Sequence, residues 1–259
     1  MTPRLGRLDL IAVPGLPPVR PGDDVAGLIL AALATQDMPL GDGDMVVVAQ
    51  KIVSKAEGRI VDLGTVTASA RAQALGKVCA KDPRLVEVIL SESVRVVRAV
   101  ENILIVEHRL GFIHANAGVD HSNVDDSGGA RVPLLPSDPD GSAGRLRNAF
   151  EEASGKTVGV LINDSMGRAW RRGTVGHAIG SAGVTAVADL RGEADLFGTA
   201  LISTDVGVGD ELAAAASLVM GQAGEGTPVV LIRGAGAYVG GEDTARSLLR
   251  DPDTDLFRS

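Results

Sequence analysis

The stretch VGVLINDSMGRAWRRG, residues 158–173, places reactive side chains at the end of an apolar run. The strand-forming residues Val158–Ile162 are followed by the carboxylate of Asp164 and the hydroxyl of Ser165, and three arginines follow within residues 168–172. Two interpretations compete. The segment is either a charged, solvated turn at the surface or a place where a metal ion and phosphate groups meet.

A second polar segment, NAGVDHSNVDD at residues 116–126, carries Asp120 and Asn123. Together with Asp164 and Ser165 it offers carboxylate, amide and hydroxyl oxygens, which suit hard cations such as Mg²⁺ or Mn²⁺. Mg²⁺ usually takes only one or two protein carboxylates and completes its shell with water and substrate phosphates.

Cationic and glycine-rich segments could hold the anionic partner of such a cation. Lys51, Lys55 and the arginines that follow Ser165 could bind phosphate or carboxylate oxygens. The N–H groups of the loop MGQAGEGTP, residues 220–228, could cradle phosphates. Each motif taken singly is more often a solvated turn. The spacing alone therefore leaves two interpretations open, a metal- and phosphate-dependent enzyme and a set of solvated surface turns.

Several familiar sites fit poorly. The phosphate-binding motif G-x-x-x-x-G-K-[ST] is absent, and GAGAYVGG at residues 234–241 leaves no room for the βαβ unit of a dinucleotide-binding fold. Asn163 stands where the nucleophile elbow of a serine hydrolase needs glycine. The four histidines, at positions 108, 114, 121 and 177, lack the spacing of a zinc site.

Composition narrows the class of protein. The 259 residues carry a formal charge of −8 and only six aromatic side chains, which argues against nucleic acid as the main partner. The longest apolar run, Val25–Ala34, is too short to cross a membrane. No signal peptide is visible, and the single cysteine, Cys79, cannot form an internal disulfide, so we expect a cytoplasmic protein.

Hydrophobic patterning predicts a mixed α/β (α+β) chain without repeats or an obvious linker. The expected strands are 8–13, 45–53, 102–106, 111–114, 158–162 and 228–232, with further extended chain over 54–63. The expected helices are 24–35, 67–78, 83–94, 145–153 and one that Asp210 caps and that ends near Gly221. Residues 115–142 are expected to be mostly loop, and the pattern does not assign the glycine-rich segment 174–184.

Six longer motifs follow one another along the chain: IAVPGLP…RPGDD, GDGDMVVVAQKIVSKAEGR, NAGVDHSNV, LLPSDPDGSA, INDSMGRAWRRGTVGHAIG and GDELAAAASLVMGQAGEGTPVVLIRG. In sequence and in order they resemble those of the coenzyme F420-0:L-glutamate ligase (F420 gamma-glutamyl ligase) family. The resemblance extends from about Leu8 to Leu249. Some actinobacterial relatives continue into a C-terminal flavin-binding domain. We expect residues 1–259 to form a single stand-alone ligase unit with two interwoven lobes.

The resemblance implies a GTP-dependent amide ligase. Such an enzyme adds L-glutamate to coenzyme F420-0 and then adds further γ-linked glutamates. Each carboxylate is activated as an acyl phosphate, and GDP and phosphate are released. The family resemblance also implies Mg²⁺ or Mn²⁺ and K⁺ as cofactors, an intertwined homodimer, small-molecule substrates, and no nucleic-acid or membrane partner.

Site residues carried over from the resemblance fall into three groups. The implied metal ligands are Asp120, Asp164, Ser165 and Gln222. The implied catalytic residues are Asp120, Asp164, Lys55 and Arg168. The implied GTP contacts are Leu16, Pro17, Pro18, Val19, Gln50, Lys51, Lys55, Asn123, Met220, Gly221, Gln222, Ala223, Gly224, Glu225, Gly226 and Thr227.

Two positions depart from the family pattern: archaeal relatives carry an acidic residue where this chain has Gln222, and relatives often carry serine at position 50. Two alternative functions stay open from the sequence. One is a related ligase acting on a different carboxylate acceptor. The other is a GTP-binding homologue that has lost catalysis, for which the neutral Gln222 is the motivating feature.

Overall fold

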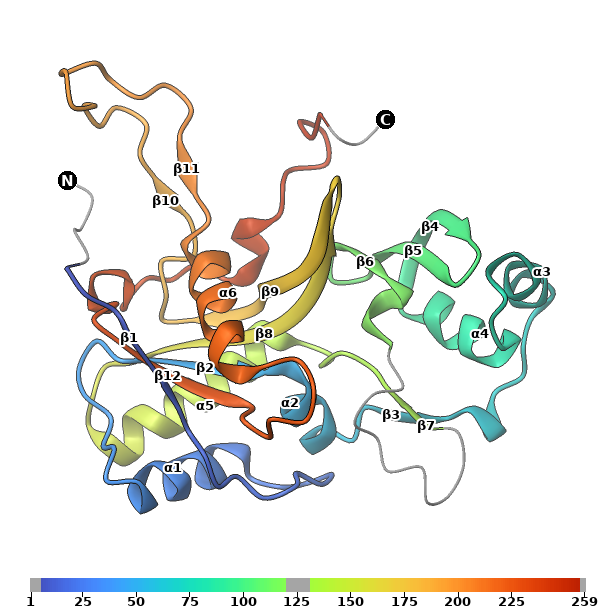
Figure 1. Cartoon of the computed structure of the whole chain (residues 1–259), viewed down its shortest axis with the longest axis horizontal. Helices are drawn as coiled ribbons and strands as arrows, with labels where there is room; N and C mark the ends of the chain where they lie inside the picture. Colours follow the sequence, from blue (N-terminus) through green and yellow to red (C-terminus); the bar gives the residue numbers. More distant parts are fainter. Residues whose placement is uncertain (1–5, 120–130, 257–259) are drawn as a thin grey trace.

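A computed structural model describes residues 6–119 and 131–256 of the chain. Its centre is a five-stranded sheet in the order β1-β12-β2-β8-β9 (Figure 1). Only β2 and β8 run parallel, and the other neighbouring pairs are antiparallel. The strands are β1 (Asp9–Ala12), β2 (Met45–Ala49), β8 (Gly159–Arg168), β9 (Arg171–Ala182) and β12 (Val229–Arg233).

Helices cover both faces of this sheet, which explains why β2 is apolar along its whole length. Helices α1 (Val25–Thr35) and α5 (Pro139–Ser154) cover one face of the sheet, and α6 (Val208–Met220) covers the other (Figure 1). Val46 and Val48 belong to the same hydrophobic cluster as residues of α1 and α5, whereas Met45 and Val47 belong to the cluster that includes α6. All four side chains are buried. The polar residues that follow β2 are therefore held at the edge of a sheet that is covered on both sides.

A second, smaller region has its own hydrophobic cluster, built from residues of 63–134. Leu85, Val86 and Ile89 give its helix α4 an apolar face, as the 3.6-residue period predicts. The elements of this region are α3 (Ala70–Cys79), α4 (Pro83–Ser91), the sheet β4 (Ser93–Val100), β5 (Ile103–His108) and β6 (Ile113–Ala115), and the pair β3 (Ile60–Asp62) and β7 (Arg131–Pro133).

An ion-pair cluster ties these elements together. Arg59 and Arg109 both reach Oε2 of Glu92, at 2.8 and 2.9 Å, and Arg59 and Arg109 also donate to backbone carbonyls of residues 135 and 137. Burial alone would raise the pKa of Glu92, but His108 and the two guanidiniums outweigh it and lower the pKa to about 2. Nε2 of His108 lies 3.7 Å away, beyond hydrogen-bond distance, so the two arginines carry most of this effect.

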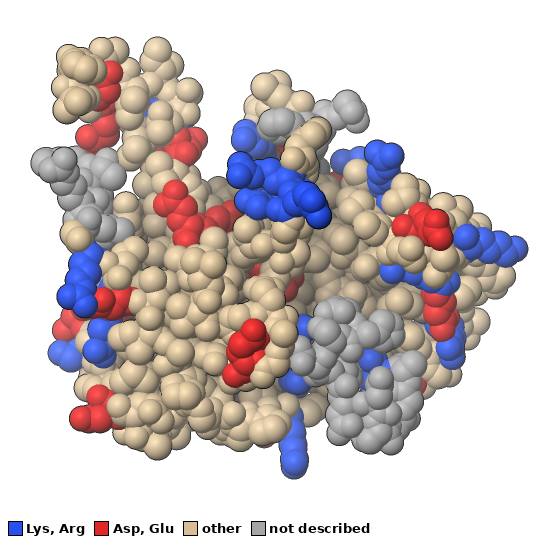
Figure 2. Space-filling view, in the orientation of Figure 1, with Lys and Arg blue, Asp and Glu red and all other residues tan. Residues whose placement is uncertain are grey.

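Two segments extend from the central sheet. The strands β10 (Ala188–Asp189) and β11 (Asp205–Val206) begin a long arm, whose side chains Leu196, Phe197 and Ile202 are 92%, 88% and 89% exposed (Figure 1). The turn between β8 and β9 carries the exposed Trp170 and a group of arginines, seen as a basic patch in Figure 2.

The mixed α/β class predicted from the sequence is confirmed, but several elements differ from the prediction. The strand expected over 45–53 ends at Ala49, and Gln50–Ala56 form helix α2 instead. The helix expected over 83–94 ends at Ser91 and gives way to β4. The glycine-rich segment 174–184, which the pattern did not assign, mostly belongs to β9.

Helix starts were also misplaced. Helix α5 begins at Pro139 rather than 145, with the side chain of Asp138 accepting a hydrogen bond from the N–H of Gly141. Asp210 does not cap α6: Gly207 holds that position, and Oδ1 of Asp210 accepts the N–H of Ala178 on the edge strand β9. The carboxylate of Asp210 thus pairs with the sheet instead of with its own helix.

Candidate active site

The parallel pairing of β2 and β8 brings the polar segments of the sequence together. Ala49 is the register partner of Asn163, so the two carboxyl ends lie side by side. Helix α2 starts at Gln50 directly after β2, while β8 continues through Asp164 and Ser165. Ligand sites of open α/β sheets lie in the crevice outside the carboxyl ends of parallel strands.

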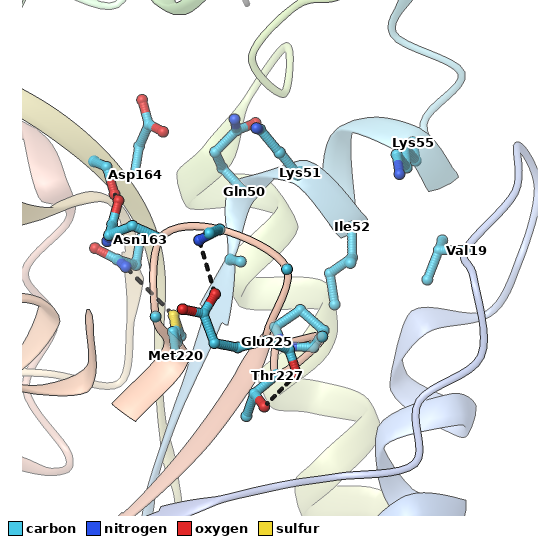
Figure 3. Close-up of a pocket in the computed structure, with 18 of the residues that line it drawn as sticks. Val19, Gln50, Lys51, Ile52, Lys55, Asn163, Asp164, Met220, Glu225 and Thr227 are labelled. Carbon is cyan, nitrogen blue, oxygen red and sulfur yellow. Dashed lines mark hydrogen bonds between the residues drawn. The ribbon is translucent and has the colours of Figure 1, made fainter. Parts of the chain in front are cut away.

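A cavity of ≈ 750 Å³ opens at this edge of the sheet. Its volume lies within the range of small-molecule and cofactor pockets. Figure 3 shows its side chains around a common space, with Asp164 on one side and Lys55 and Val19 on the other. The wall is formed by five segments: 16–19, the β2–α2 junction 49–55, residues 114–119, residues 163–165, and the loop 220–228 between α6 and β12.

Three oxygen-bearing side chains meet on the β8 side of the cavity. The hydroxyl of Ser165 donates a 2.7 Å hydrogen bond to Oε1 of Gln222, and Asp164 lines the same wall. A carboxylate, a hydroxyl and an amide oxygen are ligands that suit Mg²⁺ or Mn²⁺. Within residues 6–119 and 131–256, no group of three or more His, Cys, Asp or Glu side chains is placed to hold a metal ion, and the donor set here contains one carboxylate, that of Asp164.

Asp164 has a partner that the sequence did not suggest. Nε2 of His114 lies 3.2 Å from Oδ2 of Asp164, and Nδ1 of the same ring lies 2.7 Å from the carbonyl oxygen of Ala115. Burial alone would lower the pKa of His114, but its hydrogen bond to the Asp164 carboxylate and the negative charge there raise it above its ordinary value. Both partners of the ring are acceptors, which agrees with a ring that donates from both nitrogens.

Two lysines from helix α2 also line the cavity. Burial and the neighbouring charge of Lys51 lower the pKa of Lys55 below its ordinary value of 10.5. The reduction is what desolvation in a cationic neighbourhood produces, and an anion bound between the two ammonium groups would reverse it. The lysines are therefore placed to meet a phosphate or a carboxylate.

Buried polar atoms in the cavity wall point to a polar ligand. Oε1 of Gln50 and Oδ1 of Asn163 are buried and have no hydrogen-bond partner in the part of the chain that the structure describes. Nδ2 of Asn163 does have one, because it donates to Oγ of Ser217 at 3.0 Å. Buried polar atoms left unpaired are rare in native proteins and are usually satisfied by a ligand, an ion or water.

The loop after α6 already holds an anion of its own. The carboxylate of Glu225 accepts the N–H of Ala223 at 2.7 Å. Gly221 has φ +73°, and a side chain there would collide with the carboxylate of Glu225. The glycine therefore permits a loop shape in which backbone N–H groups face negatively charged oxygen, as a phosphate cradle requires.

Comparison with known proteins assigns this chain to a family. The sequence profile described as F420-0:Gamma-glutamyl ligase matches residues 15–234, which include every segment of the cavity wall. The chain belongs to the F420-0:gamma-glutamyl ligase family. The prediction of a ligase is thereby confirmed.

Three relatives, each called coenzyme F420:L-glutamate ligase, illustrate how similar the chain is to this family. The protein of Methanothermobacter thermautotrophicus is 47% identical over 252 residues, covering 97% of this chain and 99% of the relative. That of Methanocaldococcus jannaschii is 44% identical, covering 85% and 87%. That of Archaeoglobus fulgidus is 41% identical, covering 97% of both chains.

The ligase fold gathers nearly all the site residues predicted from the sequence. Of the implied GTP contacts, all that the structure describes line the cavity: Leu16, Pro17, Pro18, Val19, Gln50, Lys51, Lys55, Met220, Gly221, Gln222, Ala223, Gly224, Glu225, Gly226 and Thr227. Asp164 and Ser165 line it too. Asp120 and Asn123 lie outside the described residues.

Arg168 is the predicted catalytic residue that does not line the cavity. It ends β8, and Nη2 donates to the carbonyl oxygen of Arg172 at 3.4 Å, within the turn to β9. Sequence reasoning missed His114 and Asn116, which line the wall beside Asp164. The only signal for His114 was its place just before NAGVD, the segment already singled out for its oxygens.

No helix in the described ranges is long and apolar enough to cross a membrane, in keeping with the short apolar runs of the sequence.

Proposed function

We propose that this ligase joins L-glutamate to the terminal carboxylate of coenzyme F420-0 and then adds further glutamates through γ-linkages, using GTP. The observation that carries the proposal is the single cavity in which the implied nucleotide contacts, the two α2 lysines and the oxygens of Asp164, Ser165 and Gln222 converge. Family membership supports the acceptor and the amino acid, since the relatives bear the name coenzyme F420:L-glutamate ligase.

The chemistry of the reaction explains why such a cavity is needed. Amide formation from a carboxylate in water is unfavourable, so the carboxylate must be activated. In the proposed sequence, an oxygen of the acceptor carboxylate attacks the γ-phosphorus of GTP and GDP departs. The amine of glutamate then attacks the carbonyl carbon of the acyl phosphate, and phosphate departs with the former carboxylate oxygen.

The protein contributes positioning and charge neutralisation to these steps. The loop 220–227 would hold the phosphates of GTP through its N–H groups. In the structure the N–H of Ala223 donates to the carboxylate of Glu225, and a phosphate oxygen would take the place of that carboxylate. Lys51 and Lys55 would meet the anionic oxygens on the opposite wall.

Asp164, Ser165 and Gln222 would hold a divalent cation, Mg²⁺ or Mn²⁺, with Asp120 as a further proposed ligand. When bound, that cation neutralises phosphate charge. The donor set fits this task because each described member provides an oxygen. K⁺ is proposed as an additional activator.

A ligation assay tests the proposal. Purified protein is mixed with F420-0, glutamate, GTP, Mg²⁺ or Mn²⁺, and K⁺, and the products are read by mass spectrometry beside ATP and metal-free controls. The proposal expects a mass gain of one or more glutamyl groups that requires GTP and metal. Product with another carboxylate acceptor but not F420-0 would point to the related-ligase alternative. GTP binding without any product would point to a homologue with lost catalysis.

We further propose that the ligase is a homodimer. Support comes from the long arm that β10 and β11 begin, whose side chains Leu196, Phe197 and Ile202 are almost fully exposed. Apolar groups presented together in this way mark interaction surfaces. Light scattering coupled to size exclusion should give twice the 26.5 kDa chain mass, and Phe197→Ser should shift the protein toward the monomer. A monomeric wild-type protein at micromolar concentration would contradict this part of the proposal.

A further inference from the structure

We infer that His114 is a positioning residue of the ligase, which fixes the carboxylate of Asp164 through a hydrogen bond and so prepares it to bind a divalent cation. The inference deepens the proposed function and rests on it for the identity of the metal site. It concerns two residues 50 positions apart, one on β6 and one on β8.

The first argument is the geometry of the ring. Nε2 lies 3.2 Å from Oδ2 of Asp164, and Nδ1 lies 2.7 Å from the carbonyl oxygen of Ala115. A ring held at both nitrogens has a fixed plane as well as a fixed position. The bond to Asp164 engages Oδ2, which would leave Oδ1 to bind a cation.

The second argument is the surroundings of the pair. The side chains of His114 and Asp164 are only 10% and 14% exposed, so water competes little for their hydrogen bond. The ring centroids of Phe112 and His114 lie 6.2 Å apart, and the ring of His108 stacks on that of Phe112 with their centroids 5.1 Å apart. This row of three rings from the smaller region holds the imidazole against the central sheet.

The third argument is energetic. A lone carboxylate can rotate about its side-chain bonds, and binding a cation would then cost the free energy of fixing it. A hydrogen bond to a ligating carboxylate removes that cost, and losing such an outer partner typically weakens metal binding or activity by about 10- to 100-fold. Of the described oxygens in the proposed metal site, Asp164 carries the only negative charge, so its orientation matters most.

Metal affinity without any substrate tests the inference directly. Titration of the protein with Mn²⁺ alone, followed by the electron paramagnetic resonance of free Mn²⁺, gives the Kd for each variant. We expect His114→Ala to raise this Kd by about 10- to 100-fold. His114→Gln, whose amide N–H reaches about as far as Nε2, should restore the Kd to within a few-fold of wild type.

His177 provides a matched control. It pairs with Asp164 across β8 and β9, yet its Nδ1 contacts the carbonyl oxygen of Val175. His177→Gln should leave the Kd within about two-fold of wild type, since the hydrogen bond of its ring goes to Val175 and not to the Asp164 carboxylate. Melting curves recorded with chelator check folding, and His114→Leu fills the space of the ring without a donor if the alanine variant fails to fold.

Three outcomes would overturn the inference: an unchanged Kd in His114→Ala, equal weakening in His114→Gln and His114→Leu, or equal weakening in His177→Gln. The last would show that loss of either histidine weakens binding, so that the hydrogen bond from His114 would not be the specific cause. Wild-type protein that binds no Mn²⁺ would overturn both the inference and the metal site of the proposed function. Because no acceptor is present, the result does not depend on which carboxylate the ligase uses.

Discussion

Ser165 and Gln222, 57 positions apart in the chain, are joined by a 2.7 Å hydrogen bond from the serine hydroxyl to the glutamine carbonyl oxygen. The bond links β8 to the loop after α6, and therefore links the proposed metal site to the proposed phosphate cradle. A neutral amide donates its oxygen to a cation without contributing charge. At position 222, a substitution should therefore change the proposed affinity for metal with the least change of shape.

Gln222→Glu should tighten Mn²⁺ binding by about 10-fold, because metal affinity rises with the number of charged oxygen ligands. The new carboxylate can still accept the hydrogen bond of Ser165. Gln222→Leu, similar in size but without an oxygen, should weaken binding instead. Mn²⁺ titration checks both variants, and a glutamate variant that binds no better than wild type would remove residue 222 from the metal site.

Asp164→Asn should reduce turnover by at least about 10²-fold while leaving the folded fraction nearly unchanged, since it removes a preorganised electrostatic group from the site proposed to bind phosphates. Steady-state ligation rates and circular dichroism measure the two effects. Near-normal turnover in the variant would show that Asp164 does not hold the metal.

Gly176→Ala should destabilise the fold by about 1–3 kcal/mol, the usual range for overpacking. A methyl group there would lie 2.5 Å from the carbonyl oxygen of Ala213 and 2.6 Å from Oδ1 of Asn163, where α6 packs on β9. The melting temperature should fall by several degrees. Gly167→Ala, on the same hairpin with open space around the added carbon, should melt like wild type. Equal melting of both variants would contradict the close packing of α6.

Glu92→Gln should weaken the fold near neutral pH but much less in acid. The folded-state pKa of Glu92 is about 2, below its ordinary value of 4.5. The paired carboxylate therefore stabilises the fold above pH 4.5, and this stability, about 3 kcal/mol at most, is lost as the pH falls toward 2. Urea unfolding at pH 7 and pH 3 should show the gap between wild type and variant shrinking.

Asp189→Asn is the control for this pH dependence. Its pKa is also lowered to about 2, mainly by its hydrogen bond from Arg191, yet this pair lies at the solvent-exposed base of the arm. Exposed ion pairs contribute little to stability, so the variant should differ little from wild type at either pH. A pH-independent gap for Glu92→Gln would contradict the proposed role of its charge.

Much of the fold and the site could be predicted from the sequence. The continuous apolar strands, the helices with one apolar face and the polar residues at strand ends all follow from local patterns. Asp164, Ser165, Lys55 and the 220–227 loop were each suspected because of their residue types. That they meet in one cavity depends on the parallel pairing of β2 and β8, which no local pattern contains.

The errors have physical causes. Ile52 and Val53 follow β2 after only two polar residues, and a short apolar run does not distinguish a strand from a buried helix turn. Strand β4 is mostly exposed along its length, so its sequence lacks the alternation of a half-buried strand. For α5, the pair Asp138 and Pro139 was a usable start signal, because proline favours the first helical position after a capping aspartate.

The contact between His114 and Asp164 could not have been predicted locally. It needs the smaller region to fold back against β8, and it joins elements 50 positions apart. A single histidine in an apolar strand is more often structural than functional, and the sequence contains no second histidine at metal-ligand spacing.

The most direct test of the account is an oxygen-transfer experiment. F420-0 labelled with ¹⁸O in its terminal carboxylate is incubated with the ligase, glutamate, GTP and Mn²⁺, and the released phosphate is analysed by mass spectrometry. The account predicts a glutamylated product and, for each F420-0 that is glutamylated, one phosphate that carries one ¹⁸O atom, with both reduced at least about 10²-fold in Asp164→Asn. Phosphate from later γ-linked additions is unlabelled, because it takes its oxygen from a glutamate carboxylate. Glutamylated product without any labelled phosphate, or full activity in Asp164→Asn, would contradict it.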